Sequence, residues 1–108
     1  MAVSNEQIEQ VKDLFAELGD ISTRKMMGGL AIYQRDTIFA LLHSSGQLYL
    51  KGADDYGEKL EELGSTRWSY KKKDSGREVK MPYWTLPDSA VDDPDEACEL
   101  ARAALQHL

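Results

Sequence analysis

Residues 30–51 read LAIYQRDTIFALLHSSGQLYLK, and this stretch decides the fold. β-branched, aromatic and aliphatic side chains fill residues 30–33, 37–42 and 47–51, a composition that is typical of strands. The segments between them are short, and short connections join antiparallel neighbours. We therefore predict a three-stranded antiparallel meander. Its middle strand is apolar on both faces, which predicts a central position with helices on one side.

Helices are predicted at both ends of the chain. Ser4 and Gln7 have the spacing of a capping box, apolar side chains follow at helical spacing, and Gly19 ends this first helix. Near the C-terminus Asp93 is the expected N-cap and Pro94 takes the first helical position. An unbroken apolar stripe at i, i+3, i+4 and i+7 then continues to the end of the chain.

A short helix and a second hairpin follow the meander. Asp54 is expected to cap the helix and Gly64 to close it. The hairpin comprises residues 67–72 and 78–85. Its Trp68 and Tyr70 alternate with basic residues, so we expect these aromatic side chains to pack under helices. Pro82 cannot donate a ladder hydrogen bond, which predicts an edge strand or a bulged one.

These elements predict one α+β domain covering residues 1–108, because no linker divides the chain. The element order is α-β-β-β-α-β-β-α. It gives two layers, an antiparallel sheet of about five strands with three helices on one face. The expected core side chains are Phe15, Phe39, Leu41, Leu50, Leu100 and Leu105.

Composition narrows the class of protein. The net charge of −6 argues against general affinity for nucleic acid. The single cysteine, Cys98, excludes an intramolecular disulfide. The N-terminal residues lack the pattern of a signal peptide, and no apolar run is long enough to span a bilayer. We therefore expect a cytoplasmic protein without a membrane partner.

No arrangement of residues in the sequence points to catalysis. The soft metal ligands His43, Cys98 and His107 lie far apart without motif spacing, so we expect no metal, no cofactor and no enzyme activity. Gly28 and Gly29 could present backbone N–H groups to an anion. No helix is predicted to follow them, as phosphate-binding glycine motifs require, so a bend into the sheet is the favoured interpretation.

Charge is distributed unevenly along the chain. Residues 67–80 contain six bases and two acids, whereas residues 88–99 contain six acids and no base. The simplest interpretation is two solvated faces. The alternative is a working surface on the basic hairpin and on the segment before the first strand, with partner-binding candidates Arg24, Lys25, Gly28, Gly29, Lys71, Lys72 and Lys73.

Three partners are compatible with this surface. A protein partner with an acidic patch would be steered to it, and binding would weaken as salt rises. The hairpin 67–80 could instead bind nucleic acid. The acidic start of the last helix, at residues 92–96, could also meet the hairpin of a second copy and give a homodimer.

Several segments together resemble one family. Residues 24–33 read RKMMGGLAIY, followed by TIFAL at 37–41, GQLYLK at 46–51 and MPYW at 81–84. In this order they are similar to the TfoX/Sxy N-terminal domain, although Met27 stands where that family usually has Phe. The resemblance implies a secretion-chaperone-like fold and a non-enzymatic regulatory or adaptor role. Full-length members activate bacterial competence genes with the cyclic-AMP receptor protein, which implies a partner in the transcription machinery.

The resemblance covers nearly the whole chain. The 108 residues are expected to leave no room for the C-terminal domain of the full-length regulators. We therefore expect a stand-alone domain of the TfoX N-terminal type that acts by binding a protein. The alternative remains a nucleic-acid-binding module that uses the basic hairpin.

Overall fold

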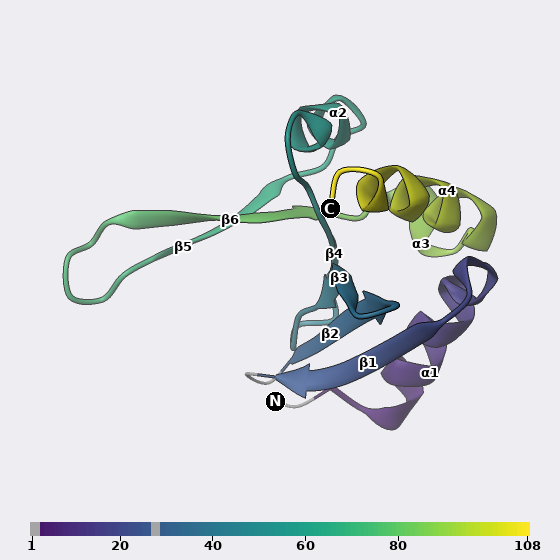
Figure 1. Ribbon diagram of the computed structural model, residues 1–108. Helices are drawn as coiled ribbons and strands as arrows, with labels where there is room; N and C mark the ends of the chain where they lie inside the picture. Colours follow the sequence, from purple (N-terminus) through teal and green to yellow (C-terminus); the bar gives the residue numbers. More distant parts are fainter. Residues whose placement is uncertain (1–2, 27–28) are drawn as a thin grey trace.

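A computed structural model describes residues 3–26 and 29–108, and Figure 1 shows their arrangement. One antiparallel sheet has the strand order β1-β2-β3-β4-β6-β5. The elements in chain order are α1 (Asn5–Leu14), the 3₁₀-helix η1 (Ala16–Leu18), β1 (Ile21–Met26), β2 (Gly29–Gln34), β3 (Thr37–Leu42), β4 (Leu48–Lys51), α2 (Tyr56–Glu62), β5 (Arg67–Lys71), β6 (Glu78–Thr85), α3 (Asp88–Val91) and α4 (Pro94–Leu105).

The predicted meander is confirmed as β2, β3 and β4, with β3 inside the sheet. The sheet has six strands, not about five, because β1 adds an edge strand that pairs with β2 from Ile21↔Gln34 to Met26↔Gly29. Most of its side chains are exposed, so it lacks the apolar alternation that predicts a strand. The sequence motif at residues 24–26 therefore belongs to a strand.

The helices pack on one face of the sheet and build the main core there. Phe15 and Phe39 are fully buried and meet edge-to-face, with ring centroids 5.2 Å apart. Leu50 is also fully buried. The expectation for Leu100 and Leu105 was wrong, because both only pack against the core and stay partly exposed. The fully buried residues of α4 are small and let the helix approach the sheet: Ala97, Cys98, Ala101 and Ala104.

The helix caps are local features, and most are as predicted. Ser4 Oγ accepts from the Gln7 backbone N–H, and Gln7 Oε1 accepts from the Ser4 N–H. The Asp93 carboxylate likewise accepts from the first N–H groups of α4. The predicted Asp54 cap is wrong. The residue before α2 is Asp55, which makes no side-chain cap, and the Asp54 carboxylate pairs with His107 instead.

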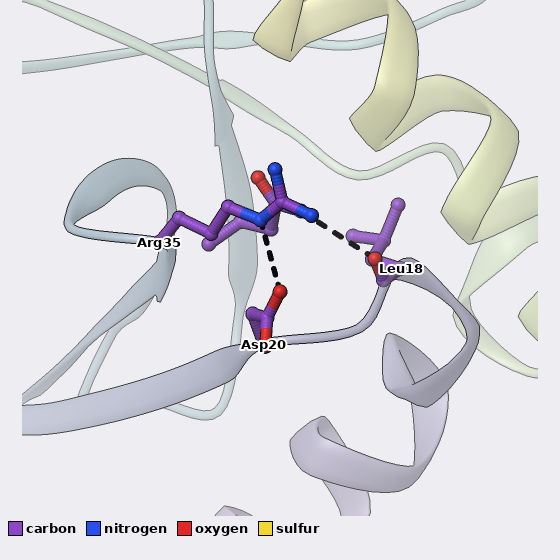
Figure 2. A network of polar contacts seen from close by, with 4 residues as sticks. Leu18, Asp20 and Arg35 are labelled. Carbon is purple, nitrogen blue, oxygen red and sulfur yellow. Dashed lines mark hydrogen bonds and ion pairs between the residues drawn. The ribbon is translucent and has the colours of Figure 1, made fainter.

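The tight turn between β2 and β3 is tied to the start of β1 (Figure 2). Arg35 and Asp36 both have positive φ, 49° and 68°, as a two-residue hairpin turn with the sheet's twist requires. Arg35 Nε donates to Asp20 Oδ2 over 2.9 Å, and the Arg35 backbone N–H donates to the Asp20 carbonyl over 3.2 Å. Gln34 Nε2 also donates to the Leu18 carbonyl. These bonds fix the direction in which the edge strand leaves the helical layer.

The hairpin of β5 and β6 extends away from the rest of the molecule in Figure 1. The strand β6 lies between β4 and β5, so Pro82 is not on an edge strand. The register runs from Arg67↔Trp84 to Ser69↔Lys80, which sets residues 81–83 of β6 opposite Trp68 alone. Pro82 thus lies in a bulge, the second alternative that its missing N–H predicted. We call residues 69–80 the basic arm.

Candidate functional site

The face of the sheet opposite the helices is the most distinctive surface of the described chain. Strand register and alternation bring side chains from all six strands to it. We call it the open face. Its members are Ser22, Arg24, Met26, Ala31, Tyr33, Ile38, Leu41, Tyr49, Lys51, Trp68, Tyr70, Val79, Met81, Tyr83 and Thr85.

An aromatic cluster occupies the centre of the open face. The Trp68 ring lies 5.6 Å from Tyr49, 6.3 Å from Tyr83 and 5.8 Å from His43, measured between ring centroids. Tyr83 and Leu41 are buried by their neighbours in this cluster, which is separate from the core under the helices. The expectation that Trp68 and Tyr70 pack under helices was therefore wrong.

The reason for this error is physical. Alternation correctly places Trp68 on the face opposite Arg67, but it does not tell which face the helices cover. The face covered by helices is the one with Arg67 and Trp84. There the Arg67 guanidinium lies 4.7 Å from the Trp84 ring centroid, and its Nε donates to the Met81 carbonyl.

A pocket of about 220 Å³ opens beside this aromatic cluster. Gly29 is among its lining residues, and glycine is needed there because a Cβ would lie 2.6 Å from the Leu42 carbonyl oxygen of the neighbouring strand. Gly28, the other predicted glycine, lies outside the described residues. Methionine side chains adapt to the shape of what they contact, so this pocket suits an apolar side chain. Its main lining residues are Met26, Leu41, Trp68, Met81 and Tyr83.

The charged side chains at the strand positions of the open face are both basic. Arg24 pairs with Ala31 on this face, and its guanidinium lies 6.0 Å from the Tyr33 ring centroid. Lys51 pairs with Tyr83 and shares the face. None of the open-face positions holds an acidic residue, although the chain has 19 of them. An acidic group that approaches the strand positions of this face therefore meets Arg24 and Lys51, whereas Asp36 of the β2–β3 turn lies beside Arg24 at one border.

The structure separates the residues that were predicted as one binding surface. Lys25 follows Arg24 but pairs with Leu30 and points to the helix side of the sheet. Lys71, Lys72 and Lys73 are exposed on the basic arm, away from both. Arg24 and Gly29 are thus at the open face, whereas the lysines belong to other surfaces.

The environment of Cys98 does not favour a role as a nucleophile. The Cys98 side chain is fully buried, and its Sγ–H donates to the Leu14 carbonyl over 3.4 Å. Burial raises the pKa of this thiol, which disfavours the reactive thiolate. Among residues 3–26 and 29–108, no three His, Cys or acidic residues converge on a point where they could hold a metal ion.

Tyr56 joins α2 to the last helix and carries a pH-dependent prediction. Its hydroxyl donates to the Leu100 carbonyl over 2.7 Å, and burial raises its pKa from 10.0 to about 12. The stability from the neutral hydroxyl is therefore complete below pH 10.0 and is lost as pH rises toward 12. We expect Tyr56→Phe to be less stable than wild type at neutral pH, with the difference narrowing at alkaline pH. Chemical denaturation across that range measures it, and a difference independent of pH would contradict the assignment.

A comparison with known protein families gives a match that covers most of the chain. Residues 13–108 match the TfoX N-terminal domain family. The chain belongs to this family. The match to the TfoX N-terminal domain includes every strand, and hence the open face and the basic arm.

A curated relative adds a biological setting. The chain is 32% identical over 65 residues to the DNA transformation protein TfoX1 of Aliivibrio fischeri. That alignment covers 60% of this chain and 31% of the relative, so the matched TfoX segment spans less than a third of the longer protein. Within the described residues, no helix is both long enough and apolar enough to cross a membrane.

Proposed function

We propose that this TfoX N-terminal domain is a non-enzymatic regulatory adaptor that binds an acidic segment of a protein partner on its open face. One observation carries the proposal. A sheet face built of aromatic and aliphatic side chains is not covered by any helix of the described residues, and in an acidic protein its strand positions hold two bases and no acid. Exposed apolar surface of this kind marks interaction sites in soluble proteins.

The chemistry of the face defines the partner. Arg24 and Lys51 provide the positive charge, and the pocket beside Trp68 accepts one aliphatic or aromatic anchor residue. Interfaces of this type draw most of their affinity from such an anchor, while charges at the rim steer association. The partner segment is therefore expected to carry a large apolar side chain with acidic side chains two positions to either side, because alternate residues of an extended segment point to the same side. Similarity to DNA transformation protein TfoX1 favours a partner in the machinery that regulates competence genes.

Single-stranded nucleic acid is the second candidate, because aromatic side chains and nearby bases form stacking platforms. The protein partner is favoured for two reasons. Tyr83 is only 8% exposed, and the Trp68 ring contacts the rings of His43, Tyr49 and Tyr83, so the central rings pack against one another rather than standing apart to receive bases. The face itself provides only two bases, in a chain with a net charge of −6.

Calorimetric titration with a short synthetic peptide that has one Leu or Phe and a Glu two positions to either side tests the proposal at low and physiological salt. We expect saturable binding that weakens with salt, and no binding of the same peptide with Lys in place of Glu. Arg24→Glu should weaken binding by about tenfold, or about 1.4 kcal/mol. Lys25→Glu is the matched control, because the neighbouring residue points to the other face. Equal effects of both variants, or tighter binding of single-stranded DNA than of the peptide, would contradict the proposal.

A further inference from the structure

The helical side of the molecule contains a second feature, which the adaptor function does not use. A groove of about 410 Å³ lies between α1 and the junction of α3 with α4. Its floor is apolar, from Val11, Leu14, Leu42 and Leu48, and Val91 remains 41% exposed at its side. Asp13 and Asp92 line the groove, and none of the described residues that line it is basic.

The basic arm carries the complementary charge. It contains five bases against Asp74 and Glu78, and all five are exposed. None of them forms an ion pair within residues 3–26 and 29–108, where the ion pairs are Arg35–Asp20 and His107–Asp54. The arm bases are Lys71, Lys72, Lys73, Arg77 and Lys80.

The arm does not reach the groove of its own molecule. In Figure 1 the turn of the β5–β6 hairpin lies at one end of the molecule, and α1 and α3 lie at the opposite end. The longest dimension of the chain is 42 Å. A contact between arm and groove must therefore form between two molecules.

We propose that the basic arm of one copy binds the acidic groove of a second copy. Lysine suits the groove because its aliphatic stem covers apolar surface while its ammonium group reaches a carboxylate. In the contact, the stems of the arm lysines lie over the floor of the groove and their ammonium groups pair with Asp13 and Asp92. The arm shares Tyr70 and Val79 with the open face, but Lys71 and Lys80 alternate with them and point to the opposite side. The self-association therefore uses different side chains from the adaptor function.

Charge reversal in both partners tests this contact in the full chain. The arm variant is Lys72→Glu with Lys73→Glu, and the groove variant is Asp13→Lys with Asp92→Lys. Sedimentation equilibrium of the wild type should show self-association that weakens as salt rises. Each variant alone should lower the association constant by at least about tenfold, because its arm and groove then carry the same sign. Lys25→Glu with Lys59→Glu, which reverses two bases elsewhere, should leave the association constant unchanged.

A mixture of the two variants gives the sharpest outcome. The acidic arm of the arm variant then fits the basic groove of the groove variant. The unchanged basic arm of the groove variant fits the unchanged acidic groove of the arm variant. We expect the mixture to associate about as tightly as wild type, with both variants folded by circular dichroism. A monomeric wild type at every concentration and salt, or a mixture that does not associate, would overturn the inference. Unchanged peptide binding by the arm variant would show that the open face acts separately.

Discussion

Replacing Phe15 with alanine is expected to lower the free energy of unfolding by about 3–5 kcal/mol. The side chain is fully buried between the first helical segment and the sheet, and its ring meets Phe39 edge-to-face at 5.2 Å. Its removal leaves a cavity in the main core. For a domain of this size the loss is a large part of a total stability of roughly 5–15 kcal/mol.

Urea denaturation measures the effect of Phe15→Ala, with Leu63→Ala as the control. Leu63 is 56% exposed, so its truncation should change stability by less than about 1 kcal/mol. If Phe15→Ala cost no more than Leu63→Ala, α1 and η1 would not be docked on the sheet as described.

Gly57→Ala is expected to destabilise the protein, although alanine is the better helix former by up to about 1 kcal/mol. Gly57 lies in the first turn of α2, and a Cβ there would fall 2.3 Å from the Trp84 ring. Gly52 meets the same ring from the preceding loop, with its Cβ position 2.6 Å away. The Trp84 Nε1–H is also fixed by donation to Glu61 Oε2 over 2.8 Å. The ring therefore cannot move aside cheaply, and overpacking should cost about 1–3 kcal/mol or more.

Thermal or chemical unfolding shows whether Gly57→Ala lowers or raises the free energy of unfolding. Glu58→Ala, at an exposed position of the same helix, is the control and should be close to neutral. A gain in stability for Gly57→Ala would show that helix propensity outweighs packing, and that Trp84 does not pack against α2.

The parts of the fold that sequence predicts well are those with local causes. The Ser4–Gln7 capping box and the Asp93 cap depend on residues a few positions apart, and both are present. The strand β1 was missed because it is an edge strand with mostly exposed side chains, and Ile21 is its one large apolar residue that packs against the main core. The large residues predicted on α4 proved peripheral, since close approach to the sheet selects the small residues Ala97 and Ala101.

The candidate site was only partly accessible to sequence reasoning. Arg24 and Gly29 were predicted at a binding surface, and both lie at the open face. The aromatic cluster was missed, although the signal that could have found it was present. Trp68, Tyr83 and Tyr49 all occupy alternate strand positions, but the face they share depends on the pairing of β4 with β6 and on where the helices dock. Those are tertiary facts that local patterns do not contain.

The most direct test of the proposed function is a map of where the acidic peptide binds. Amide chemical shifts of the ¹⁵N-labelled protein, followed during titration with the same acidic peptide that carries one Leu or Phe, provide this map. We expect the largest shifts at Arg24, Ala31, Trp68, Met81 and Tyr83, with α1 and α4 unaffected. Shifts confined to the helical layer, or none at saturating peptide, would contradict the claim that this domain works through its open face.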